Sequence, residues 1–155
     1  MPKNDLPELA LALTQARLQG MGHVVDANKK GLWYFAHPYT VRDAAGRCVL
    51  EAEDANYRLC CRRAGYLIRR GYNVFAPICH SHPILCATPA LRGRGAVLWY
   101  VLDNQIIERC DFDGIILAPG WQNSAGCRHE RELFKQEGLP VLTFRTIRPS
   151  EDTPT

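Results

Sequence analysis

Four short apolar runs alternate along the chain with longer segments in which apolar residues recur every three or four positions. The runs are residues 32–36, 73–76, 114–118 and 141–144. Their uninterrupted apolar character predicts strands that are buried on both faces. The longer segments are residues 51–70, 98–110 and 126–137. Their spacing predicts helices, and the alternation predicts an α/β fold: a flavodoxin-like or Rossmann-like three-layer sandwich with a central parallel sheet.

Three other segments lie outside this alternation. Residues 6–19 begin with capping-box spacing and a proline in the first turn, which predicts an accessory helix. Residues 78–95 contain two prolines and two glycines, so we expect an irregular loop, long enough to act as a lid. The polar residues 149–155 are expected to form a frayed tail. The pattern therefore predicts a single domain over residues 1–155 with its core at residues 32–144.

Composition narrows the class of protein. The chain has 155 residues, of which 46% are hydrophobic, and this is enough for one domain to fold without disulfides or a structural metal. A net charge of +3 is too small to predict binding to a nucleic-acid polymer. The seven cysteines form an odd set, and no secretory signal is evident, so we expect reduced thiols in a cytoplasmic protein. No apolar run approaches the roughly 20 residues that cross a bilayer, so no membrane association is expected.

The segments that follow the predicted strands are the first places to look for a site. Ligands of open parallel sheets bind beyond the carboxyl ends of the strands, here at residues 36–40, 77–82 and 119–130. The third segment has small residues before a predicted helix, whose backbone N–H groups and dipole favour an anion. Asn123 or Ser124 also suits a helix N-cap, and taken alone the cap is the favoured interpretation.

The position of Glu130 adds support for a ligand site at this turn. It shares a predicted helical face with Leu133 and Phe134, one turn after the cap, so its carboxylate is expected to point toward the sheet. A desolvated glutamate beside an anion-binding turn suits a nucleophile or a general base. A solvated glutamate that complements the helix dipole is equally supported by the residues alone. Asp103 and Tyr34 can reach the same cleft, although periodicity favours a surface aspartate and a core tyrosine.

Other chemistries find less support. A cluster of zinc-type side chains has irregular spacing and no paired Cys-x-x-Cys, so we expect no metal site. Its members are Cys79, His80, His82 and Cys86. There is no P-loop and no Gly-x-Gly-x-x-Gly, and we expect no cofactor. Trp99 and Trp121 suit stacking on a base, although a core position is the favoured interpretation for both.

Three motifs occur in an order that matches a known enzyme family. Residues 33–39, WYFAHPY, are similar to its first strand and tight turn. In residues 103–111, Asp103 lies eight positions ahead of Asp111, like a catalytic aspartate ahead of the one that precedes the next strand. Residues 124–130, SAGCRHE, reproduce the serine, glycine and glutamate spacing of a nucleophile motif. The chain thus resembles the nucleoside 2-deoxyribosyltransferase family, which includes N-glycosidases of nucleoside 5′-monophosphates and related phage and bacterial proteins.

The resemblance implies a role for each motif. Glu130 would attack the anomeric carbon to form a glycosyl-enzyme intermediate, as a carboxylate nucleophile does in retaining glycosidases. Asp103 would protonate the departing base or orient the sugar, and Tyr34 would hold Glu130. Ser124 and Gly126 would bind a 5′-phosphate at the helix start. The remaining substrate-binding residues implied are Ala36, His37 and Asn123.

The function implied is an N-glycosidase that cleaves the base–sugar bond of (deoxy)nucleoside 5′-monophosphates. Two alternatives remain open: a 2-deoxyribosyltransferase that exchanges bases, and a noncatalytic nucleotide-binding sensor. The resemblance also implies small-molecule nucleotide or nucleoside substrates and a homodimer or larger homo-oligomer. His37 stands where many relatives have glycine, and residues 127–129 replace smaller ones. These departures leave the base and the sugar substituent open.

Overall fold

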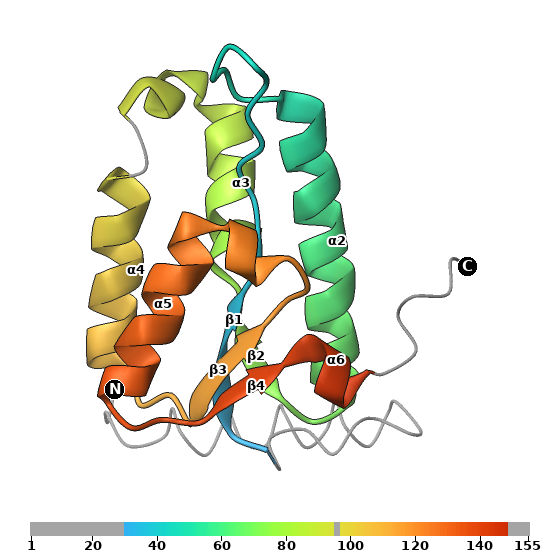
Figure 1. The fold of residues 1–155 in the computed structure, drawn as a ribbon, viewed down its shortest axis with the longest axis vertical. Helices are drawn as coiled ribbons and strands as arrows, with labels where there is room; N and C mark the ends of the chain where they lie inside the picture. The colour runs from blue at the N-terminus through green and yellow to red at the C-terminus, as the bar shows by residue number, and fades with distance from the viewer. Residues whose placement is uncertain (1–29, 95–96, 149–155) are drawn as a thin grey trace, which may run out of the picture.

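The computed structural model describes residues 30–94 and 97–148, and its centre is a four-stranded parallel sheet (Figure 1). The strands are β1 (Leu32–Ala36), β2 (Asn73–Phe75), β3 (Gly114–Leu117) and β4 (Val141–Thr143). Their order across the sheet is β2-β1-β3-β4, and every neighbouring pair is parallel. This confirms the predicted α/β three-layer sandwich. The order corresponds to that of flavodoxin-like sheets. The helix predicted at residues 6–19 and the tail at 149–155 lie outside the described residues.

Helices cover both faces of this sheet. They are α2 (Leu50–Arg69), α3 (Pro77–Ala87), α4 (Val97–Arg109), α5 (Ala125–Gln136) and α6 (Phe144–Ile147), with 3-10 turns η1 (Pro89–Arg94) and η2 (Trp121–Asn123). In Figure 1, α4 and α5 lie on one side of the sheet, and α2 and α6 lie on the other. In the part of the chain that is described, no helix has both the length and the apolar character needed to cross a membrane.

The side chains of β1 are divided between the two faces, because successive strand residues point to opposite sides. Trp33 and Phe35 join the core that α2 and α6 complete. Tyr34 and Ala36 join the core that α5 completes, with contributions from α4. All four side chains are buried. Tyr34, which the sequence predicts near the site, therefore lies on the face of the sheet that α5 covers.

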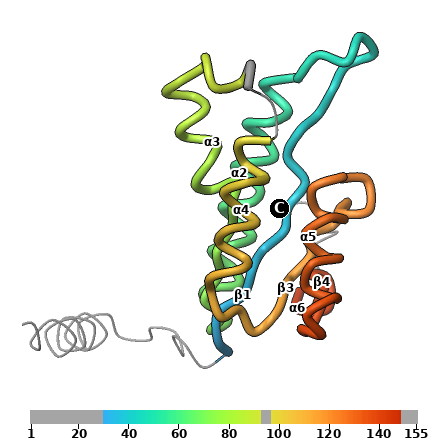
Figure 2. Tube along the Cα trace, turned by 90° about the vertical axis from the view of Figure 1, so that its left-hand side faces the viewer, coloured from blue at the N-terminus to red at the C-terminus, as the bar shows by residue number. Residues whose placement is uncertain are grey.

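The connections place a topological switch point beside β1. The chain leaves β1 through α2 and returns as β2 on one side of it, then crosses through α3 and α4 to β3 on the other side. Figure 2 shows the chain continuing beyond the carboxyl end of β1 before α2 runs back alongside the sheet. Reversal of strand order opens a crevice between the carboxyl ends of the two strands, where open α/β sheets bind ligands.

The prediction of an irregular loop over residues 78–95 is wrong. Most of this segment is helical, as α3 and η1. Pro77 occupies the first turn of α3, where its missing N–H costs nothing. Pro83 lies inside the helix, but the buried residues Ile78, His82 and Leu85 follow helical spacing and pack the helix onto the rest of the fold. Tertiary packing therefore outweighs the unfavourable local proline.

Gly114 gives a test of how tightly the central sheet is packed. Its φ of +157° suits glycine, and a Cβ there would lie 2.5 Å from the Pro140 carbonyl oxygen and 2.6 Å from the Trp33 ring. We expect Gly114→Ala to lower the free energy of unfolding by roughly 2–4 kcal/mol. Gly65→Ala, at a helical site with open space around it, should instead raise it by up to about 1 kcal/mol. Denaturant unfolding measures both, and equal effects of the two substitutions would contradict this account of β3.

Candidate active site

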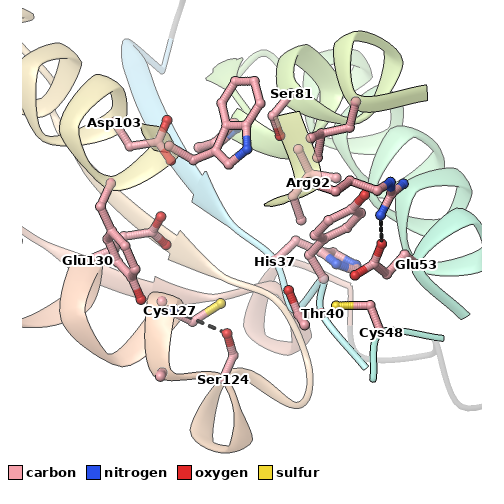
Figure 3. A pocket seen from close by; sticks show the side chains of 18 of the residues that line it. His37, Thr40, Cys48, Glu53, Ser81, Arg92, Asp103, Ser124, Cys127 and Glu130 are labelled. Carbon is pink, nitrogen blue, oxygen red and sulfur yellow. Dashed lines mark hydrogen bonds and ion pairs between the residues drawn. The ribbon is translucent and has the colours of Figure 1, made fainter. Parts of the chain in front are cut away.

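A cavity of about 540 Å³ lies at the switch point (Figure 3). Its volume is typical of sites for small molecules, which range over about 300–1,000 Å³. All three predicted post-strand segments contribute to its lining. They do so through His37 after β1, Ile78 after β2, and residues 123–127 after β3. Glu130, in the same segment as residues 123–127, and Asp103 of α4 also line it, so residues from four parts of the chain meet in one place.

The hydroxyl group of Tyr34 donates a hydrogen bond to Glu130 Oε1 at 2.8 Å. The tyrosine ring is fully buried, and its centroid lies 5.5–5.8 Å from those of Phe75, Phe112 and Phe134. These tilted and edge-on contacts leave the ring no room to turn. The phenol is thus fixed by the core of the sheet while its hydroxyl holds Glu130, which lines the cavity. Tyr34 is therefore a core side chain, as periodicity favours, and it also contacts a residue of the cavity.

Two of the carboxyl groups that line the cavity, Glu130 and Asp103, hold protons more tightly than ordinary carboxyl groups do. Burial raises the pKa of Glu130 to about 8, assisted by the negative charge of Asp103 and opposed by the Tyr34 hydrogen bond. Burial also raises the pKa of Asp103 to about 6. A carboxylate is poorly solvated in such a place, so the charged form is disfavoured. Between about pH 6 and pH 8 the pair therefore holds one proton.

The amino end of α5 forms another wall of the cavity. Ser124 is the N-cap of the helix, and its Oγ accepts a hydrogen bond from Cys127 N at 3.3 Å. This confirms the N-cap predicted from the sequence, while the hydroxyl proton stays available for a ligand. Ala125 and Gly126 line the cavity in the first helical turn, where backbone N–H groups have no acceptor within the helix. This end of the cavity suits an anion.

The other predicted binding residues lie in different environments. His37 lines the cavity but is buried, with Nε2 2.8 Å from Arg63 Nη1 and Nδ1 2.8 Å from the Pro38 carbonyl oxygen. Asn123 lines the cavity and is exposed. Ala36 does not line it: this residue is buried in the sheet, and its carbonyl oxygen accepts a hydrogen bond from Ala118 N.

Several cavity residues were not proposed from the sequence. Glu53 in α2 and Arg92 in η1 form an ion pair in the wall, and Trp99 of α4 lines the cavity although a core position was favoured for it. One sign of Glu53 was present in the sequence: it lies four residues before Tyr57, at the start of the apolar face of the predicted helix. Arg92 lies in the segment that was predicted to be an irregular loop, so no pattern pointed to it.

The structure divides the zinc-type side chains that were weighed from the sequence: His82 Nε2 lies 3.4 Å from Cys86 Sγ, whereas Cys79 packs elsewhere. Cys79 faces α2, with its Sγ 3.5 Å from that of Cys61. His82 instead contacts the Tyr39 hydroxyl through Nδ1 at 2.8 Å. Within residues 30–94 and 97–148, no group of three or more histidine, cysteine, aspartate or glutamate side chains is arranged to hold a metal ion.

Two comparisons with known proteins bear on the chain. The model of a family described as "Domain of unknown function (DUF1937)" matches residues 31–146, which include every side chain of the cavity described above. No curated protein matches the chain.

The raised pKa of Glu130 predicts a loss of stability as pH rises. The folded-state pKa lies above that of the unfolded chain, so the contribution is present below the unfolded value and is lost as pH rises through about 8. Glu130→Gln has no proton to lose, so its free energy of unfolding should fall less than that of the wild type between about pH 5 and pH 8. Denaturant titration across this range measures the difference. The exposed Glu132→Gln, on the same helix, is the control, and parallel curves for wild type and Glu130→Gln would contradict the burial of this acid.

Proposed function

We propose that this chain, which belongs to the family described as "Domain of unknown function (DUF1937)", is an N-glycosidase of (deoxy)nucleoside 5′-monophosphates. The observation that carries the proposal is the hydrogen bond from Tyr34 to Glu130 in a cavity that also contains Asp103. A fixed carboxylate beside a second carboxyl group of raised pKa is what cleavage of a glycosidic bond requires. The resemblance to the nucleoside 2-deoxyribosyltransferase family supports the same residues.

In the first step, an oxygen of the Glu130 carboxylate forms a bond to C1′ of the sugar. The bond from C1′ to the base nitrogen breaks, and its electron pair leaves with the base. Asp103 gives its proton to the departing base, so a neutral base and an Asp103 carboxylate result. The negative charge of Glu130 stabilises the positive charge that develops on the sugar ring before the new bond is complete.

In the second step, water replaces the enzyme on the sugar. The Asp103 carboxylate accepts a proton from the water while its oxygen attacks C1′, and the ester bond to Glu130 breaks. Glu130 leaves as a carboxylate, and Asp103 is protonated again for the next turnover. Two displacements at C1′ retain the configuration of the sugar. Attack by a second base in place of water would make the same intermediate part of a transferase reaction.

The hydrogen bond from Tyr34 has a further role in this scheme, because the pair shares one proton near neutral pH. The reaction needs that proton on Asp103 and the negative charge on Glu130. By these pKa values, about 8 for Glu130 and about 6 for Asp103, the proton lies mainly on Glu130. The Tyr34 hydroxyl donates to Glu130 and lowers its pKa, so it reduces the cost of moving the proton to Asp103. Tyr34 is therefore a positioning residue that also biases the protonation of the pair.

The amino end of α5 supports a 5′-phosphate as the second binding feature. Ser124 and Gly126 flank the first turn, and they lie on the same helix as Glu130. A phosphate held by these N–H groups would fix the sugar relative to the nucleophile without any mobile side chain. We also propose that the substrate is a free small molecule, that the protein acts in the cytoplasm, and that it forms a homo-oligomer.

A turnover screen tests the proposed activity. We expect wild type to release free base from nucleoside 5′-monophosphates, and to act on the matching nucleosides with a kcat/KM lower by a factor of 10 or more, because phosphate contacts are lost. Glu130→Gln should lose about 10³-fold or more in kcat while still binding the monophosphate. Chromatography measures base release, and calorimetry measures binding.

Controls separate the candidate functions in this screen. Glu132→Gln, on the exposed side of α5, should keep wild-type turnover. Addition of a free acceptor base distinguishes a transferase, which forms a new nucleotide, from a hydrolase. Tight binding of monophosphates without turnover by the wild type would favour a nucleotide sensor and would refute the enzyme.

The pH profile tests the shared proton. For wild type, kcat/KM should rise through about pH 6 and fall through about pH 8, because the singly protonated pair is the active form. Asp103→Asn should be slower by roughly 10²–10⁴-fold. Its profile should rise with pH to a plateau and lose the alkaline fall, with a midpoint below 8, because the charge of Asp103 no longer raises the pKa of Glu130.

The phosphate of the substrate also titrates near pH 6. Wild type and variant are therefore compared on the same substrate, so that this titration is common to both profiles. A bell-shaped profile for Asp103→Asn, with the same two limbs as wild type, would remove Asp103 from the acid and base role.

A further inference from the structure

A second charged pair lines the cavity, and the proposed mechanism does not use it. Arg92 Nη1 donates to Glu53 Oε2 at 2.5 Å. Glu53 is only 2% exposed, whereas the Arg92 side chain is 26% exposed. Figure 3 shows the pair across the cavity from Glu130 and Asp103, with His37 lying between. A buried ion pair is expensive to desolvate and adds little net stability, so its place in a cavity wall calls for a ligand-based explanation.

The charges of the pair argue against a phosphate as its ligand. Arg92 is already neutralised by Glu53, so the pair offers no net positive charge to a phosphate. The amino end of α5 supplies that instead. The pair still has unused hydrogen-bonding groups: a guanidinium has five N–H donors, and the described residues give Glu53 a hydrogen bond only at Oε2. Donors therefore lie beside a free carboxylate acceptor, which is the complement of a flat, neutral, polar edge.

The difference in burial between the two side chains indicates which group on the edge of a nucleobase faces each of them. Glu53 is the more deeply buried of the two, and Arg92 is the more exposed. An exocyclic substituent projects beyond the ring of a nucleobase, so this group reaches the deeper residue, and the adjacent ring nitrogen faces Arg92. A carboxylate can only accept hydrogen bonds. The substituent must therefore be a donor, namely an amino group, and a carbonyl oxygen at the same place would repel Glu53.

We propose that Glu53 and Arg92 form the base-recognition site of this cavity, and that they select nucleotides whose base has an exocyclic amino group beside an unprotonated ring nitrogen, as in cytosine and adenine. The amino group donates to Glu53, and the ring nitrogen accepts from Arg92. The same pairing of a carboxylate with the cytosine amino group occurs in protein readout of nucleic-acid bases. This inference rests on the proposed function, because attack by Glu130 at C1′ places the sugar and directs the base to the opposite wall.

Matched substrates test the inference without any mutation. Deoxycytidine and deoxyuridine 5′-monophosphates differ at this edge by amino against carbonyl, as do deoxyadenosine and deoxyinosine 5′-monophosphates. We expect the wild-type kcat/KM to favour the amino member of each pair by about 10-fold to 100-fold, the range for one well-placed base contact. Equal rates, or a preference for the carbonyl member, would overturn the proposal.

A variant then assigns the preference to Glu53. Glu53→Gln keeps the length of the side chain but adds an N–H₂ donor, so the ratio of amino to carbonyl substrate should fall at least 10-fold and approach or pass unity. Glu51→Gln, on the exposed side of the same helical turn, should keep the wild-type ratio. If a folded Glu53→Gln variant kept the wild-type ratio of amino to carbonyl substrate, another residue would be recognising the base. Circular dichroism and denaturant unfolding establish whether each variant is folded. If Glu53→Gln does not fold, the rates of wild type on the two substrate pairs test the proposal alone.

Binding measurements keep this inference separate from the proposed activity. If wild type releases no base from any of the four monophosphates, the N-glycosidase is refuted. Calorimetric Kd values for the same four compounds then test the recognition site by themselves. Tighter binding of both amino members supports the site, and equal Kd values within each pair, or no binding, overturn it.

Discussion

The hydrogen bond between Tyr34 and Glu130 is the constraint on which the cavity depends. The Tyr34 hydroxyl would be an unsatisfied buried polar group without Glu130, because aromatic rings enclose the phenol, and the Glu130 carboxylate is only partly exposed in the cavity wall. The bond therefore offsets part of the cost of placing an acid in the interior. It also fixes the direction of the carboxylate, since Tyr34 has no freedom to follow a moving partner. The Glu130 carboxylate is thus oriented by the core of the sheet and not by a loop.

That arrangement requires the strand order that the fold has. A tyrosine on one face of β1 reaches α5 only because β3, which leads into α5, pairs directly with β1. The same order sends α2 to the opposite face, and its first turn then meets the far side of the cavity through Glu53. The switch point therefore collects acids from α2, α4 and α5 at one end of the sheet. If the strands followed the order β1-β2-β3-β4 across the sheet, these three acids would be separated.

The sequence predicted the parts of this arrangement that depend on local patterns. Continuous apolar runs identified β1 and β3, and capping chemistry placed the N-cap of α5 at Asn123 or Ser124, of which the structure has Ser124. The segment of α3 was predicted to be a loop because Pro83 outweighs its few buried positions in a local pattern, although packing against α2 decides the outcome in the fold. Glu53 and Arg92 were not foreseen for a related reason. Their pairing joins residues 39 positions apart, and nothing in either segment specifies the other.

The three polar parts of the cavity would complement three different parts of the proposed substrate. The amino end of α5 suits an anion, the Glu130 carboxylate suits a centre that becomes positive, and the neutral pair of Glu53 and Arg92 suits an uncharged edge. A phosphate near Glu130 would by itself raise the pKa of that acid further and weaken it as a nucleophile. The N–H groups of α5 oppose this effect, because they stabilise the phosphate charge without adding a proton to the site. In the proposed reaction, an anion site on the same helix as Glu130 would therefore let a doubly charged substrate bind beside an acid that must itself become charged.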